Sequence, residues 1–139
     1  MIGAGYWGKN LARNFNALGV LHTLADLNQG ILDTYGADYQ GVLKTRLIEE
    51  LWTDHAITKV VIAAPAVYHY RLAKAALLAG KDVFVEKPLC LDPVEAQELI
   101  DLAATNQRIL MVGHLLQYHH PDQRDQRKAD ERPVRNRQA

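Results

Sequence analysis

Three glycines near the start of the chain have the spacing of a loop that holds a diphosphate. Gly3, Gly5 and Gly8 form the pattern G-x-G-x-x-G within the opening MIGAGYWGKN. The first glycine of such a loop permits a tight turn, the second lets the backbone approach the pyrophosphate, and the third lets a helix pack close to a strand. The amino end of that helix offers free N–H groups and a positive dipole to the phosphates. The spacing alone also arises by chance, so the pattern needs support from other residues.

Asp26 provides part of that support. It lies eighteen residues after Gly8, at the end of the strand expected at 20–26. A carboxylate at this place accepts both hydroxyls of the adenosine ribose and repels a 2′-phosphate. No arginine follows Asp26 closely, so NAD is expected rather than NADP. The alternative is that Asp26 is a helix cap or a turn residue, because the sequence DLN is typical of turns.

A second group of polar residues follows a later strand. Glu86 and Lys87, in the sequence FVEKPL, come at the carboxyl end of an apolar run. Open α/β sheets bind their ligands at this edge. A lysine that is partly desolvated beside a cofactor can exchange a proton with a hydroxyl group. The alternative is a solvated lysine at the end of a strand.

The elements that must position these residues alternate along the chain. Strands are expected at 20–26, near Val42, and at 59–64, 82–88 and 108–113; helices are expected at 8–18, 31–35, 47–53, 68–79 and from Asp92 onward. Strands that alternate with helices predict a parallel sheet with helices on both faces, the doubly wound Rossmann architecture. The last 19 residues are strongly polar, so the chain is expected to form one domain at 1–120 and a disordered tail at 121–139.

Two helices show an apolar face. In the first, Leu11, Phe15 and Leu18 are expected to be buried, with Gly19 ending the helix. The last helix has Asp92 as its cap and Pro93 in its first turn. Its expected buried face consists of Ala96, Leu99, Ile100 and Ala103.

The composition excludes several classes of function. The 139 residues include 16 basic and 16 acidic side chains, so neither a nucleic acid nor a membrane surface is expected as a partner. Cys90 is the only cysteine, which excludes an internal disulfide, and we expect it to be a packed thiol. We expect neither a secretion segment nor a membrane-spanning apolar run. A cytoplasmic enzyme or binding domain is therefore expected.

Three longer stretches resemble one protein family. GAGYWGKN, AAPAVYHYRLAKAALLAGKDVFVEKPL and MVGHLLQYHH together resemble the amino-terminal half of the Gfo/Idh/MocA oxidoreductases, over residues 2–120. GYWGKN with GHLLQYH is most similar to the branch that includes the UDP-N-acetylglucosaminuronate 3-dehydrogenases. The resemblance implies NAD-dependent oxidation of a hydroxyl on a sugar or nucleotide sugar.

The resemblance also implies a role for individual residues. Lys87 would contact the substrate hydroxyl, and the Lys87–Pro88 bond is expected to be cis. Expected around the cofactor are Gly3, Gly5, Tyr6, Trp7 and Gly8 at the pyrophosphate, Asp26 at the adenosine ribose, Ala64, Pro65 and His69 along its border, and Glu86 at the nicotinamide ribose. His114 and Gln117 would face the substrate, whose charge stays open because an arginine is common in place of Gln117. No metal site is expected, since the histidines near residue 120 lack acidic or cysteine partners.

The chain departs from the family pattern at both ends. Only Met1 and Ile2 precede the glycine loop, so the first strand is expected to be truncated and its neighbouring strands to lose backbone partners. The pattern ends near His120, so the second, substrate domain is expected to be absent and the family's oligomer is not expected to form. A truncated oxidoreductase is therefore one hypothesis, and a non-catalytic dinucleotide-binding remnant is the alternative. A methyltransferase that uses S-adenosylmethionine is a third, disfavoured by the Glu86-Lys87-Pro88 sequence.

Overall fold

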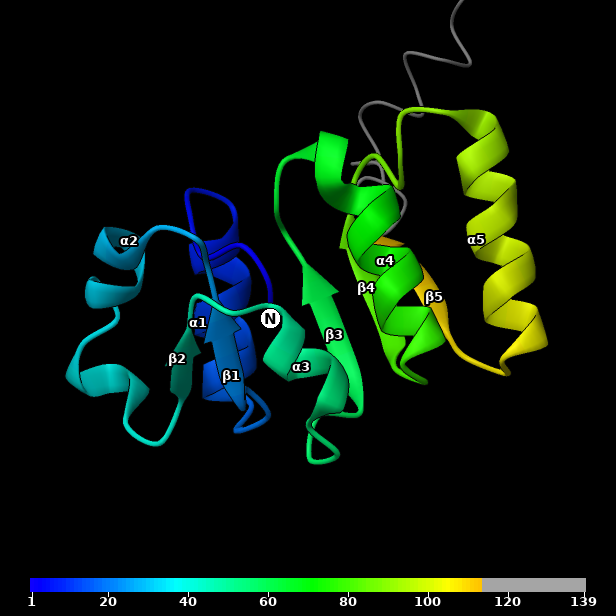
Figure 1. The fold of residues 1–139 in the computed structure, drawn as a ribbon. Helices are drawn as coiled ribbons and strands as arrows, with labels where there is room; N and C mark the ends of the chain where they lie inside the picture. The colour runs from blue at the N-terminus through cyan, green and yellow to red at the C-terminus, as the bar shows by residue number, and fades with distance from the viewer. Residues whose placement is uncertain (114–139) are drawn as a thin grey trace, which may run out of the picture.

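Helices and parallel strands alternate throughout residues 1–113, which are the residues described by the computed structural model (Figure 1). The elements in chain order are α1 (Gly8–Ala17), β1 (Thr23–Ala25), α2 (Gln29–Asp33), β2 (Leu43–Thr45), α3 (Glu49–Thr53), β3 (Lys59–Ile62), α4 (His69–Leu78), β4 (Asp82–Glu86), α5 (Pro93–Thr105) and β5 (Leu110–Gly113). The predicted order of elements is confirmed, with shorter bounds for most of them. Among these residues no helix is long and apolar enough to cross a bilayer.

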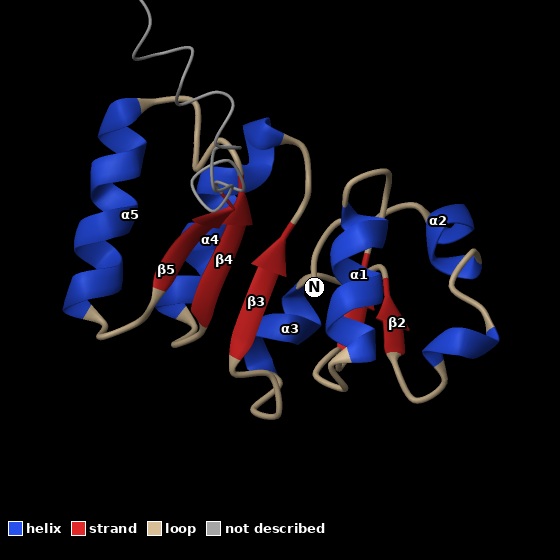
Figure 2. Ribbon diagram, turned by 180° about the vertical axis from the view of Figure 1, so that it is seen from behind, coloured by secondary structure: helices blue, strands red, loops and turns tan. Residues whose placement is uncertain are grey.

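The strands form two parallel groups that meet at the amino terminus. β1 pairs with β2, and β4 lies between β3 and β5. Ile2 forms parallel bridges to Ala25 on one side and to Ile62 on the other. The amino terminus accordingly lies between β1 and β3 in both views (Figures 1 and 2). The resulting order is β2, β1, Ile2, β3, β4, β5.

Met1 and Ile2 occupy the place of the central strand between the carboxyl ends of β1 and β3. The Ile2 amide donates to Val61 O at 2.7 Å, and Ala63 N donates to Ile2 O at 2.8 Å. On the other side, Ala25 N donates to Met1 O at 2.8 Å. The expectation that the neighbouring strands lose their backbone partners is therefore too broad, because partners remain at the carboxyl ends of β1 and β3, where Ile2 forms its two bridges.

Helices cover both faces of the sheet and bury two separate clusters of side chains. Ile2 packs with the cluster under α3, α4 and α5, whereas Met1 packs with the cluster that contains Ala12 of α1 and Leu32 of α2. This alternation follows from the two-residue period of an extended segment. Figure 2 shows α1 in front of the sheet and α4 behind it. The doubly wound parallel architecture is confirmed.

Two residues predicted to be buried are exposed. Leu18 is 71% exposed because α1 ends at Ala17, and Leu18 lies at its cap, beyond the regular helical face. Ile100 is 50% exposed because α5 lies at the edge of the sheet, against α4 and β5 (Figure 1). Of α5, Leu99 and Ala103 are buried. The Asp92 cap is confirmed, since its Oδ1 accepts from Val94 N at 2.8 Å.

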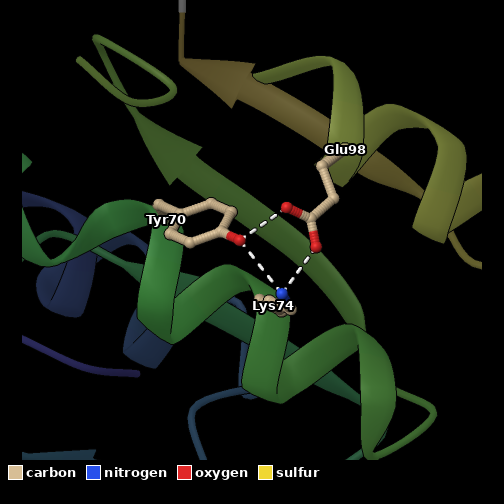
Figure 3. A network of polar contacts seen from close by, with 3 residues as sticks. All are labelled: Tyr70, Lys74 and Glu98. Carbon is tan, nitrogen blue, oxygen red and sulfur yellow. Dashed lines mark hydrogen bonds and ion pairs between the residues drawn. The ribbon is translucent and has the colours of Figure 1, made fainter. Parts of the chain in front are cut away.

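A polar network ties α4 to α5 on the exposed side (Figure 3). Lys74 Nζ lies 2.5 Å from Glu98 Oε1, and Tyr70 OH donates to Glu98 Oε2 at 2.6 Å. The hydrogen bond from Lys74, followed by that from Tyr70, holds the pKa of Glu98 below its usual range. The same pairing raises the pKa of Lys74. Because the charged ends of Lys74 and Glu98 are open to solvent, we expect the network to orient the helices more than to stabilise the fold.

Candidate active site

The glycine loop packs tightly against the sheet at two of its three glycines. Gly3 has a φ of +85°, and a Cβ there would lie 2.7 Å from the Ala64 amide nitrogen. A Cβ on Gly8 would overlap the Gly3 carbonyl oxygen. Gly5 differs, because its Cβ would meet only Ile31 Cδ1, at 3.9 Å. Gly5 therefore leaves open space on the ligand side of the loop, whereas Gly3 and Gly8 are required by the fold itself.

The loop presents unpaired amides at the start of α1. Within residues 1–113, the backbone N–H groups of Tyr6, Trp7 and Gly8 make no hydrogen bond, although Lys9 N donates to Gly5 O. These amides lie at the positive end of a ten-residue helix. Both features suit an anion such as a diphosphate. The side chains of Tyr6 and Trp7 are 78% and 63% exposed beside them.

Asp26 serves the loop and borders the cleft at the same time. Its Oδ2 accepts from Ala4 N at 2.8 Å, and its Oδ1 accepts from Asn28 N at 2.9 Å. The second bond makes Asp26 a turn residue, as the alternative interpretation expected. The half-buried carboxylate keeps free lone pairs toward the cleft. Two arginines that are distant from Asp26 in the sequence reach its surroundings. Arg46 Nε donates to the carbonyl oxygen of Leu27, the residue after Asp26, and Arg71 lines the same cleft as Asp26.

A cleft of about 660 Å³ extends from the glycine loop past Asp26. Its volume suits a nucleoside-sized ligand. Apolar side chains dominate its walls, with a tyrosine and an arginine from the start of α4: Leu27, Ile31, Ile48, Leu72, Tyr68 and Arg71. An adenosine fits this composition, since its base needs an apolar slot and its ribose a polar group.

A second cavity of about 270 Å³ holds Glu86 and Lys87. It shares Trp7 and the segment Ala63–Pro65 with the first cavity, so the two lie next to each other. Glu86 ends β4 opposite Gly113 of β5, where a Cβ would lie 3.3 Å from the Glu86 carboxylate. Lys87 is exposed, and its bond to Pro88 is cis, as expected.

His69 lines the second cavity but is almost completely covered, with 1% of its surface exposed. Its Nδ1 lies 2.7 Å from Pro88 O and its Nε2 lies 2.6 Å from Ala64 O. Both ring nitrogens are therefore engaged with the protein backbone.

Tyr35 is a site residue that the sequence did not reveal. Its hydroxyl donates to Ala4 O at 2.6 Å, so side chains hold both the N–H and the C=O of Ala4. Tyr35 is 4% exposed, and burial raises the pKa of its hydroxyl, with smaller effects of Tyr39 and Asp26. The hydroxyl thus stays a donor. A tyrosine just after the helix that follows Asp26 was the available signal, but helical periodicity does not tell where a hydroxyl points.

Two expected substrate residues, His114 and Gln117, lie outside the described residues. So does the expected tail at 121–139. Cys90 is half-buried, and burial raises the pKa of its thiol, in agreement with a packed thiol. Within residues 1–113 no three histidine, cysteine or acidic side chains are grouped as for a metal ion.

A parallel doubly wound sheet, a glycine loop with free amides and an acidic residue after the next strand together define a dinucleotide-binding domain of the Rossmann type. Residues 1–114 match the model of the Gfo/Idh/MocA oxidoreductase family, described as having an NAD-binding Rossmann fold. The chain belongs to this family. That membership leaves no support for the methyltransferase alternative.

Relatives of several kinds are similar to the chain. The oxidoreductase YdgJ of Escherichia coli K12 is 35% identical over 114 residues, which make up 82% of this chain and 33% of that protein. UDP-N-acetylglucosamine 3-dehydrogenase of Acidithiobacillus ferrooxidans is 29% identical over 122 residues, 86% of this chain and 37% of that protein. Its solved structure superposes with a TM-score of 0.76 and 27% identity, covering 92% of this chain and 41% of the other. The chain thus spans about a third of the length of the curated relatives it matches.

Proposed function

We propose that this chain binds NAD and takes part in the oxidation of a hydroxyl group on a sugar or nucleotide sugar. The observation that carries the proposal is the pair of adjoining cavities that leads from the glycine loop to Lys87. The similarity to UDP-N-acetylglucosamine 3-dehydrogenase supports the substrate class. The family description supports the cofactor.

The residues present fit the cofactor from one end to the other. The free amides of Tyr6, Trp7 and Gly8 would hold the diphosphate, and the missing Cβ of Gly5 lets it approach. Asp26 would accept the adenosine ribose hydroxyls. Glu86 would accept a hydroxyl of the second ribose, beside Pro65 in the shared wall.

Lys87 would carry out the proton transfer of the reaction. When bound, NAD supplies the acceptor for the hydride that leaves the carbinol carbon. The Lys87 amine would accept the proton that leaves the same hydroxyl, so that the carbinol becomes a carbonyl. The cavity that holds Lys87 also contains Glu86, whose carboxylate provides a negative charge for the resulting ammonium group.

We also propose that NAD is preferred over NADP. A 2′-phosphate would lie against the Asp26 carboxylate, which has no cation within its own hydrogen bonds. Arg46, whose Nε donates to Leu27 O, is engaged by the backbone of the residue after Asp26. We therefore expect repulsion to outweigh attraction at this position.

The direct test is NADH formation from a panel of sugars, inositols and nucleotide sugars. Lys87→Ala should abolish turnover and leave the Kd for NAD within about threefold of wild type, a difference of less than 1 kcal/mol. Lys59→Ala is the matched control, because Lys59 is an exposed lysine at the opposite end of β3. Turnover that survives Lys87→Ala would contradict the proposed role of the lysine.

A second candidate function is NAD binding without catalysis by this chain. The cavity beside Lys87 has only about 270 Å³, and it must also receive the nicotinamide. Ligand pockets usually exceed roughly 300 Å³, so little room is left for a sugar within the described residues. The same assay separates the two candidates: saturable NAD binding with no turnover on any substrate favours this second function.

A further inference from the structure

The imidazole of His69 connects two loops that come from different strands. The carbonyl oxygen of Ala64 contacts Nε2 of the ring. Ala64 follows β3 and lies in the wall shared by both cavities. The carbonyl oxygen of Pro88 contacts Nδ1. Pro88 follows Lys87, the first residue after β4. Because His69 is the first residue of α4, its backbone is fixed by a helix that packs on both strands.

The chemistry of the two contacts limits what the ring can do. Both partners are backbone carbonyl oxygens, which only accept hydrogen bonds. A doubly protonated imidazole donates to both, and a neutral ring donates to one and turns a lone pair toward the other. In either state no ring nitrogen is left for a cofactor atom. The family resemblance implies that His69 borders the cofactor, but its ring nitrogens are engaged with the backbone and are not available to a cofactor atom.

We propose instead that His69 is a positioning residue that holds the Lys87–Pro88 turn against the cofactor-binding loop at Ala64–Pro65. This inference rests on the proposed roles of NAD and Lys87. Nε2 lies against the loop on the cofactor side and Nδ1 against the turn on the lysine side, so the ring spans the two and sets how far Lys87 lies from the nicotinamide end of the cleft. A buried ring is suited to this task because it cannot exchange its two carbonyl partners for water.

Two substitutions separate the two contacts. The amide nitrogen of asparagine falls near the position of Nδ1, and that of glutamine near the position of Nε2. His69→Asn should therefore keep the bond to Pro88 O, whereas His69→Gln should keep the bond to Ala64 O. His69→Leu removes both and serves as the reference for a purely apolar replacement.

We expect the variants of the 139-residue chain to affect NAD affinity and the position of Lys87 separately. His69→Gln should keep the wild-type Kd for NAD, and His69→Asn and His69→Leu should raise it about tenfold, the effect of one lost bond to a buried carbonyl. Where turnover is measurable, His69→Gln should lower kcat about tenfold, and His69→Asn should lower it less. Thermal unfolding of each variant shows whether the change in fold stability follows a different order.

Lysine positioning is also measured without turnover. Trace acetylation followed by peptide mass spectrometry gives the relative reactivity of each amine, with Lys59 as the internal reference. Saturating NAD should protect Lys87 in the wild type and in His69→Asn, and this protection should be lost in His69→Gln and His69→Leu. An absence of turnover in the wild type would count against the proposed function alone, because the Kd and the protection pattern still test His69.

The positioning role is overturned if the asparagine and glutamine variants behave alike in both measurements. It is equally overturned if all three variants lose stability while NAD affinity and Lys87 protection stay unchanged. Failure of all three to fold would identify His69 as a residue of the core, and the proposal would also fall.

Discussion

The Asp26 carboxylate stabilises the glycine loop and, in the proposed function, would also bind the adenosine ribose. Its oxygens accept the amides of Ala4 and Asn28, which fixes the glycine loop to the end of β1. The remaining lone pairs are available to a ribose. The two hydrogen bonds therefore hold the carboxylate that we propose for ribose binding in a fixed place beside the glycine loop.

Asp26→Asn should change both affinity and cofactor choice. It removes the negative charge and replaces one acceptor by a donor, so NAD binding should weaken by about 10- to 100-fold, as for one charge-assisted hydrogen bond. The preference for NAD over NADP should shrink, because the repulsion of the 2′-phosphate is lost. Calorimetric titration with both cofactors measures this. Asp33→Asn, an exposed change in α2, is the control; an unchanged ratio of the two Kd values would exclude Asp26 as the selecting group.

Tyr35→Phe should weaken the glycine loop from the other side. The variant leaves Ala4 O without its donor at a buried position, at a cost of about 1–3 kcal/mol in unfolding free energy. Urea unfolding measures the loss. Tyr39→Phe is the matched control, since the two rings are in contact at 4.8 Å between centroids but only Tyr35 reaches Ala4. Equal stabilities of the two variants would contradict the role of the Tyr35 hydroxyl.

The sequence predicts which residues form this site more readily than it predicts their hydrogen-bond partners. Spacing identifies the glycines, and strand ends identify Asp26 and Glu86. The bonds of Tyr35 to Ala4 and of His69 to Pro88 cross 31 and 19 residues of chain. No local pattern encodes such contacts, because they depend on how the elements pack.

At the scale of elements, different glycines of the loop serve packing and ligand binding. Gly8 is required for packing, and Gly5 is expected to be required only for NAD binding. Gly8 lies where α1 crosses the loop, so Gly8→Ala should push the helix off the sheet and destabilise the protein severely. Gly5→Ala should keep the thermal midpoint within a few degrees, because its Cβ enters open space, yet weaken NAD binding at least tenfold by blocking the diphosphate. Thermal unfolding and a titration of each variant test the contrast. Strong NAD binding by Gly5→Ala would mean that the diphosphate lies elsewhere.

The helices and strands were predictable where capping residues or prolines mark their ends. Asp92 with Pro93 begins α5, and the cis proline follows the end of β4. The burial of side chains at the edge of an apolar helix face was less predictable. Leu18 and Ile100 satisfy the helical period, but nothing among the described residues covers them. The width of a buried stripe is set by the neighbouring elements, which the period alone does not define.

At the scale of the whole molecule, the two halves of the sheet depend on the first two residues. The Met1 amine donates to Thr23 O at 2.6 Å in a buried position. Burial lowers the pKa of this amine from 8.0 to about 5. In a polypeptide that begins with a free amine at Met1, the folded domain would hold this group neutral over a pH range in which the unfolded chain protonates it.

A polypeptide synthesised to begin at Met1 should consequently lose stability as the pH falls from 8 to 5. The unfolded state binds the extra proton in this window, so the unfolding free energy should fall by about 1.4 kcal/mol per pH unit, and by about 4 kcal/mol in all. Above pH 8 and below pH 5 this group should have no further effect. Urea unfolding across the range measures the slope. The same polypeptide acetylated at Met1 should lack this contribution, and an identical slope in both would contradict it.

The central claim is that one NAD molecule binds along the cleft from the glycine loop to Lys87. Calorimetric titration of the folded 139-residue chain with NAD, at two temperatures so that a zero enthalpy cannot hide binding, tests it directly. We expect one saturable site, weakened by both Asp26→Asn and Gly5→Ala. No heat with NAD or NADP at either temperature, from protein shown to be folded by circular dichroism, would contradict the account.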